Sequence, residues 1–197
     1  AEQAMVRSAA LDAILAWRAG RPLAIAEPDA ALRRRMMSVA VAEDIPADYD
    51  GIISAELPFA RHDEHPRVTV PAGFVAVIVG AGVSGLCAAI HFQRAGIPFE
   101  ILEKSSELGG VWRDNRYPGA GVDTPNHLYS FTFAPYDWSR YFALRGELKE
   151  YLEHVADKFQ LRRHIRFNTT QEAADFWVAT ERWGLRVRAI GGVFVRC

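Results

Sequence analysis

The segment FVAVIVGAGVSG, residues 74–85, joins a short apolar run to three glycines with the spacing G-x-G-x-x-G. A short, continuous run of apolar and mostly β-branched residues is typical of a strand buried on both faces in a parallel sheet. VSGLCAAIHFQRAG then predicts a helix that ends at Gly96, and FEILE predicts a second buried strand. Together the three segments predict a β-α-β unit with a right-handed crossover.

The three glycines suit a loop that binds a dinucleotide. Gly80 permits the tight turn after the strand, Gly82 lets a diphosphate approach the main chain, and Gly85 lets the helix pack closely on the strand. Val83 and Ser84 begin the helix, whose first amides are unpaired donors at the positive end of the helix dipole. The loop therefore predicts an anion site for a dinucleotide; the alternative is a similar strand, turn and helix without a ligand.

Glu103 ends the second predicted strand, 21 residues after Gly82. A carboxylate at this place accepts hydrogen bonds from the ribose hydroxyls of an adenosine, and charge-assisted bonds of this type contribute about 1.5–3 kcal/mol. The same charge repels a 2′-phosphate. The site therefore favours FAD or NAD over NADP.

The segment after Glu103 distinguishes FAD from NAD. In an NAD dehydrogenase the chain returns directly to helix and strand, whereas here it enters a long glycine-rich stretch. Gly109 and Gly110 would allow the main chain to approach a diphosphate or ribityl group closely, and Trp112 would supply a flat apolar wall. These features indicate a flavin site.

Residues 109–123 also carry a resemblance to a known family. Their pattern, G-G-x-W-x-x-x-x-Y-P-G-x-x-x-D, matches the second fingerprint of Baeyer–Villiger monooxygenases at every defined position, and NHLYSFTF after it is similar to that family too. The resemblance covers roughly residues 74–170. RRRMMSVAVAEDIPADY, near the amino terminus, further resembles the 4-hydroxyacetophenone monooxygenase branch.

The resemblance implies a flavoprotein that uses FAD, NADPH and O₂ to convert ketones into esters or lactones through a C4a-peroxyflavin. Asp123 is the implied catalytic residue, because the family's aspartate beside the flavin positions an active-site arginine. The cofactor-binding residues that the loop and the resemblance together predict are Gly80, Gly82, Val83, Ser84, Gly85, Glu103, Gly110, Val111, Trp112, Asp123 and Tyr129.

Plainer interpretations of three of these residues stay open. Trp112 and Tyr129 could be ordinary core residues. Asp123 could help to start a helix that has Pro125 at its first position, and this role is compatible with one in the active site.

Some signatures of a complete family member are absent from the sequence. It has no second G-x-G-x-x-G for NADPH and no F-x-G-x-x-x-H-x-x-x-W. We therefore expect an incomplete FAD domain, a truncated piece of a longer protein that is catalytically silent by itself. The alternatives are a non-catalytic flavin-binding remnant and a flavin monooxygenase that acts on nitrogen or sulfur.

The whole chain is expected to be an α/β protein with a Rossmann-like, FAD-binding β-α-β sheet. Residues 1–57 predict a helical extension of two or three short helices, residues 58–73 a linker, and residues 74–197 the truncated FAD-binding domain. RGELKEYLEHVADKF predicts a helix with one apolar stripe, and HIRFNT, DFWVAT and GLRVRAI predict strands that end in a β-meander.

Composition limits the partners and the compartment. A net charge of −1 gives no electrostatic reason to expect nucleic acid or an anionic membrane, and no apolar run approaches eighteen residues. Two cysteines do not form a disulfide framework, which fits the cytoplasm. His62 and His65 lack a matching second pair of ligands, so no metal is expected. The helical extension predicts a packing or homodimer element.

Overall fold

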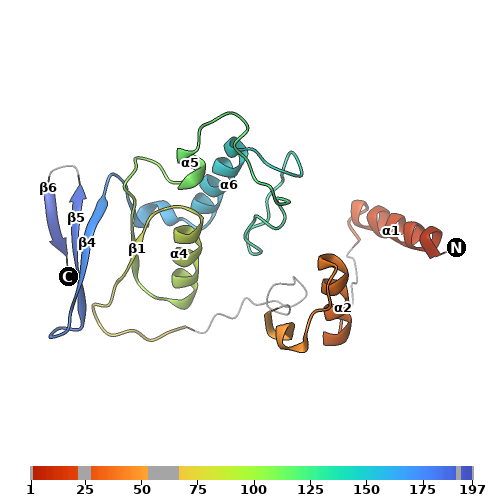
Figure 1. Cartoon of the computed structure of the whole chain (residues 1–197), viewed down its shortest axis with the longest axis horizontal. Coiled ribbons are helices and arrows are strands. Elements are labelled where there is room, and N and C mark those ends of the chain that lie inside the picture. Colours follow the sequence, from red (N-terminus) through yellow and green to blue (C-terminus); the bar gives the residue numbers. More distant parts are fainter. Residues whose placement is uncertain (1, 22–27, 53–66, 190–191, 197) are drawn as a thin grey trace. The chain divides into compact units, whose positions relative to one another are not determined.

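The computed structural model describes residues 2–21, 28–52, 67–189 and 192–196. The chain divides into two compact units, residues 1–62 and 63–197 (Figure 1). Residues 58–66 of the predicted linker, with His62 and His65, lie outside the described residues, so the predicted division of the chain stays a prediction. Within the described ranges, no cluster of histidine, cysteine and carboxylate side chains could hold a metal ion.

The elements described in the first unit are helices, as the sequence predicts. They include α1 (Glu2–Arg18), α2 (Ala30–Val41) and the short helix η1 (Ala47–Tyr49). The carboxylate of Asp29 caps α2 by accepting a hydrogen bond of 2.8 Å from the Leu32 amide. No residue of α2 is buried. Among the described helices of the chain, none is long and apolar enough to be a membrane span.

The second unit contains the predicted β-α-β unit. β1 (Ala76–Val79) and β2 (Phe99–Leu102) are parallel neighbours, and α4 (Val83–Ala95) connects them and packs on both. α4 ends where Gly96 takes a left-handed conformation with φ 76°. β3 (Ile165–Arg166) pairs in parallel with the other edge of β2, which gives the order β1-β2-β3. The sequence prediction of a Rossmann-like α/β fold is confirmed.

α6 (Arg145–Lys158) packs beside α4 (Figure 1). Its buried side chains share one stripe and pack in a single apolar cluster with those of α4 and β2. Burial of one leucine or isoleucine side chain contributes about 1.5–3 kcal/mol, so this cluster fixes α6 and α4 against the sheet. In the sequence, the short helix α5 (Val111–Asp114) and the segment 115–144 come between β2 and α6. The α6 stripe consists of Leu148, Tyr151, Leu152, Val155 and Ala156.

The prediction that β1 is buried on both faces is wrong. Ile78 is 8% exposed, but Val77 and Val79 on the other face are 38% and 60% exposed. β1 lies at the edge of the described sheet, and α4 covers only one of its faces. An apolar run reports the hydrophobicity of a strand, and its burial depends on elements that the run does not encode.

The carboxyl-terminal strands form the predicted antiparallel meander, with shifted bounds. After the short helix η2 (Leu161–His164) and β3, the meander consists of β4 (Thr170–Trp177), β5 (Arg182–Ala189) and β6 (Gly192–Arg196), in the order β4-β5-β6. β4 begins before DFWVAT because QEAAD also pairs with β5, with a register shift between Gln171 and Ala173. Glu172 in this stretch forms ion pairs with Arg186 and Arg188 of β5.

Replacement of Gly85 by alanine tests the packing of α4 on residues 80–85, which we call the glycine loop. A Cβ at Gly85 would lie 1.9 Å from the carbonyl oxygen of Gly80, so that the strand and the helix must separate. We expect Gly85→Ala to lower the free energy of unfolding by about 3 kcal/mol, the upper end for overpacking. Chemical denaturation measures this change.

Gly146→Ala in the first turn of α6 is the matched control. A Cβ at Gly146 meets no atom within 4 Å, so we expect it to raise the free energy of unfolding by about 0.4–1 kcal/mol. Equal effects of the two substitutions would contradict the close contact at Gly85.

Candidate functional site

Glu103 joins the glycine loop to the loop that follows β2. Its side chain is only 6% exposed. One carboxylate oxygen accepts a hydrogen bond of 2.7 Å from the Ala81 amide, and the other accepts one of 2.8 Å from the Ser105 amide. Since each carboxylate oxygen has two lone pairs, both can accept a further donor. Glu103 is therefore both a structural bridge and an available acceptor.

The glycine doublet approaches the glycine loop through its main chain. A Cβ on Gly110 would lie 3.0 Å from the Cα of Gly82, and the Gly109 amide donates a hydrogen bond of 3.0 Å to the Ala81 carbonyl. Gly109 and Gly110 have φ values of 123° and 51°, which favour glycine. In the structure the doublet makes a close approach to the loop at Gly82, and its close approach to a ligand stays a prediction.

A cavity of about 370 Å³ lies at the carboxyl ends of β1 and β2, where open parallel sheets bind ligands. The glycine loop, Glu103 and the start of α5 all contribute to its wall. Predicted residues in this wall are Gly80, Gly82, Glu103, Gly110 and Val111. We call this space the glycine-loop cavity.

Sequence reasoning missed other residues of the glycine-loop cavity. Lys104 brings positive charge to it, and Arg113 and Asp114 line it as an ion pair of 2.6 Å. Thr169, Thr170 and Gln171 come from the chain just after β3. The signal for the last three was the predicted strand HIRFNT. If that strand joins the parallel sheet, its carboxyl end must lie beside the carboxyl end of β2.

Trp112 and Tyr129 lie together beside a second cavity of about 230 Å³, called the aromatic cavity here. The indole nitrogen of Trp112 donates a hydrogen bond of 3.0 Å to the Tyr129 hydroxyl, and the two rings meet edge to face at 5.7 Å. Val83 also lines this cavity. Trp112 is 8% exposed and belongs to the core cluster, so it is a core residue and a cavity wall at once.

Three predicted residues line neither cavity: Gly85, which is buried against Gly80, and Ser84 and Asp123. The side chains of Ser84 and Asp123 are both exposed.

The alternative role of Asp123, at the start of a helix, is wrong. The amides of Leu128 and Tyr129 both donate to the Pro125 carbonyl, but this turn does not continue into a helix. Within the described part of the chain, the Asp123 carboxylate is free of hydrogen-bond and ion-pair partners, and it is available to a group from elsewhere.

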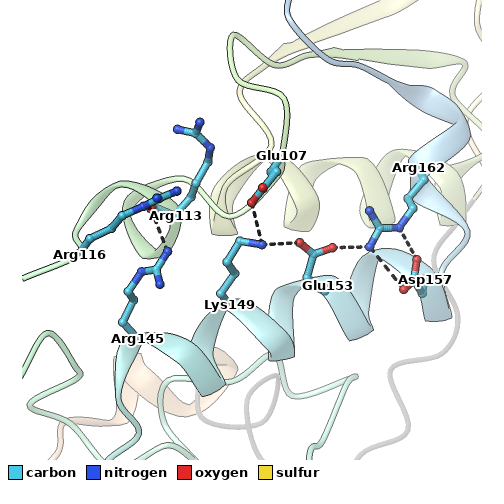
Figure 2. Close-up of polar contacts among 8 residues, drawn as sticks. All are labelled: Glu107, Arg113, Arg116, Arg145, Lys149, Glu153, Asp157 and Arg162. Carbon is cyan, nitrogen blue, oxygen red and sulfur yellow. Dashed lines mark hydrogen bonds and ion pairs between the residues drawn. The ribbon is translucent and has the colours of Figure 1, made fainter.

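A chain of ion pairs on α6 reaches the loop before the glycine doublet (Figure 2). The Lys149 ammonium lies 3.0 Å from Glu107 and 2.8 Å from Glu153. Its hydrogen bond holds the pKa of Glu107 below the usual range, and hydrogen bonds to Glu153 and then Glu107 raise the pKa of Lys149 despite partial burial. In the sequence, only the i, i+4 spacing of Lys149 and Glu153 indicates this series of ion pairs.

Comparison with known proteins agrees with this geometry. A family model described as an NAD(P)-binding Rossmann-like domain matches residues 78–143. A Baeyer–Villiger monooxygenase of Streptomyces coelicolor is 44% identical over 129 residues, covering 63% of this chain and 23% of that protein. The chain is homologous to Baeyer–Villiger monooxygenases. The resemblance carried by residues 109–123 is thereby confirmed.

Two further matches extend the homology to these monooxygenases. An uncharacterized monooxygenase of Sinorhizobium fredii, y4iD, is 38% identical over 190 residues, or 96% of this chain and 29% of that protein. The solved OTEMO complex with FAD and NADP superimposes with a TM-score of 0.57 at 32% identity, covering 64% of this chain and 24% of that one. The chain thus spans about a quarter of the length of these relatives. The 4-hydroxyacetophenone branch stays a prediction.

Removal of the Tyr129 hydroxyl tests the contact between the two aromatic residues. Tyr129→Phe leaves the buried indole N–H of Trp112 without its acceptor, so we expect the free energy of unfolding to fall by about 1–3 kcal/mol. Tyr117→Phe, at an exposed tyrosine, should leave it unchanged. Equilibrium denaturation of the two variants decides, and equal stabilities would refute the role of the hydroxyl.

Proposed function

We propose that the glycine-loop cavity binds the adenosine diphosphate part of FAD. The observation that carries the proposal is the convergence on one cavity of a buried carboxylate, Glu103, and two main-chain glycine segments, at Gly82 and Gly110. FAD fits this donor and acceptor set: the main chain at the glycines and the charge of Lys104 suit a diphosphate, and Glu103 suits ribose hydroxyls.

The residues of the chain would bind, orient and shield the cofactor. Glu103 would keep its bonds to the Ala81 and Ser105 amides and use its remaining lone pairs for the ribose. Its charge would disfavour a 2′-phosphate at the same place. Val83, Trp112 and Tyr129 would provide an apolar wall that excludes water from the flavin ring. When bound, FAD supplies the redox chemistry of the reaction.

For the whole protein we propose a Baeyer–Villiger reaction that uses NADPH, O₂ and a small ketone. The support is the homology to monooxygenases of that name. Asp123 would act by orienting an arginine, as the family resemblance implies, and its exposed carboxylate is available for this. Oxygenation at nitrogen or sulfur is the alternative, which substrate screening of the whole protein distinguishes. A cytoplasmic location and dimerisation through residues 1–57 remain predictions.

The isolated chain is proposed to bind flavin without turnover. Its sequence has one G-x-G-x-x-G, at residues 80–85, and no second one for NADPH. Ketone-dependent oxidation of NADPH by the purified 197-residue chain would refute this proposal. A non-catalytic flavin-binding protein would also be silent, so only the whole protein separates the two interpretations.

A nicotinamide dinucleotide is the second candidate ligand, because the matching family model describes an NAD(P)-binding domain. Competition with the purified chain distinguishes the ligands. We expect FAD to bind in a one-to-one ratio, with quenching of flavin fluorescence. FMN, which lacks the adenosine, should bind more weakly, and NADP⁺ should not displace FAD. Displacement of FAD by NAD⁺ at equal concentration would favour the second candidate.

Substitution of the two predicted acidic residues separates their roles. Glu103→Gln should weaken FAD binding at least about 10-fold, because a charge-assisted hydrogen bond of about 1.5–3 kcal/mol to the ribose is lost. In addition, the NH₂ group of glutamine cannot accept one of the two main-chain hydrogen bonds. Asp123→Asn, at an exposed side chain, should leave FAD affinity unchanged in this chain and abolish ketone oxygenation in the whole protein. Titration by flavin fluorescence measures both affinities. Equal losses of affinity would contradict this division of roles.

A further inference from the structure

We infer that Lys149 of α6 is a positioning residue for the FAD site: it holds the loop that carries Gly109 and Gly110 against the glycine loop. This inference rests on the proposed function, because the width of the gap between the two loops matters only if a cofactor enters it. Lys149 lines neither the glycine-loop cavity nor the aromatic cavity, so its effect on a cofactor would pass through the loop.

The loop before the doublet is held at its start by main-chain hydrogen bonds and at Leu108, which is fully buried in the core cluster. Lys149 therefore adds a contact at the exposed Glu107. Residues 103–110 form no helix or strand. The Gly109 amide reaches the Ala81 carbonyl, and beyond that bond the main chain of Gly110 makes a close approach to Gly82. A small displacement of this segment would therefore change the shape of the glycine-loop cavity, which Gly82 and Gly110 both line.

Lys149 acts on this loop in two ways. Its ammonium forms an ion pair of 3.0 Å with Glu107, two residues before Gly109. Its aliphatic stem lies beside the doublet, since the Cγ atom is 3.6 Å from the position of a Cβ on Gly109. The ammonium thus attracts the loop towards α6, while the van der Waals contact of the stem limits how closely Gly109 can approach the helix.

The ammonium is itself held in place by α6. Glu153, one turn further along, lies 2.8 Å from it and also pairs with Arg162, which in turn pairs with Asp157 (Figure 2). Lys149 is 21% exposed, so solvent screens its ion pairs less than those of a fully exposed lysine. The opposite face of α6 is in the core, which makes the helix a rigid support.

α6 holds the other end of the same segment through Arg145. The Arg145 guanidinium donates a hydrogen bond of 3.1 Å to the main-chain carbonyl of Arg113, and Arg116 donates one of 3.2 Å to the same oxygen (Figure 2). Lys149 and Arg145 lie one helical turn apart. The doublet and the start of α5 are therefore fixed to α6 at both ends, and the Arg113 side chain lines the glycine-loop cavity.

Four variants of the purified chain test the inference. Lys149→Met keeps the stem beside Gly109 and removes both ion pairs, and Glu107→Gln removes only the pair to the loop. Lys149→Arg keeps the charge. Lys158→Met, at an exposed lysine of the last turn of α6, is the matched control. FAD affinity is measured at low and at high salt, and hydrogen exchange of the Gly109 amide is measured without FAD.

We expect Lys149→Met and Glu107→Gln each to weaken FAD binding about two- to fivefold at low salt, the range for a partly exposed ion pair. The double variant should be no weaker, and Gly109 should exchange faster by a similar factor. Lys149→Arg should restore most of the affinity, and Lys158→Met should match the wild type. At about 1 M salt, where the Debye length is about 3 Å, wild type and variants should converge.

Two outcomes would overturn the inference. One is unchanged FAD affinity and Gly109 exchange in Lys149→Met. The other is a loss in Lys149→Met that Glu107→Gln does not share. Failure of the wild type to bind FAD would instead refute the proposed function, and the exchange measurement without FAD would still decide whether Lys149 positions the loop.

Discussion

The bridge that Glu103 makes between the amides of Ala81 and Ser105 is the constraint on which the site depends. A buried carboxylate costs several kcal/mol unless its charge is compensated, and two main-chain amides at 2.7 and 2.8 Å compensate it. The bridge joins the end of β1 to the end of β2. With the two ends joined, Gly82 and Gly110 come close enough to exclude any side chain between them, and the space beside them is the glycine-loop cavity.

The helices provide the rigidity that this arrangement needs. α4 begins at the glycine loop and packs on β1 and β2, and α6 packs on α4 and on α5. The residues that line the two cavities come from α4, α5 and α6, from the strands β1, β2 and β4, and from the loops between these elements. Trp112 has three contacts at once: its ring packs in the core cluster, its N–H donates to the Tyr129 hydroxyl, and it lines the aromatic cavity.

Much of this fold could be predicted because its signals are local. The glycine spacing of residues 80–85, the carboxylate at Glu103 and the glycine at residue 96 each state a backbone or charge requirement that the structure fulfils. The exposure of Val79 could not be predicted, since it depends on which elements cover the strand. Lys149 was missed because its partner Glu107 lies far away in the sequence, and ion pairs of this kind leave no periodic pattern.

The order of the strands in space has a consequence for biosynthesis. β2 occupies the middle of the sheet, yet its second neighbour, β3, ends 64 residues later, at Arg166. At about 5–20 residues per second, the ribosome needs roughly 3–13 seconds to supply that stretch. During this interval the nascent β-α-β unit would have one edge of β2 unpaired and no α6 beneath its loop. The ability to capture a cofactor would thus mature only after α6 and β3 have been synthesised.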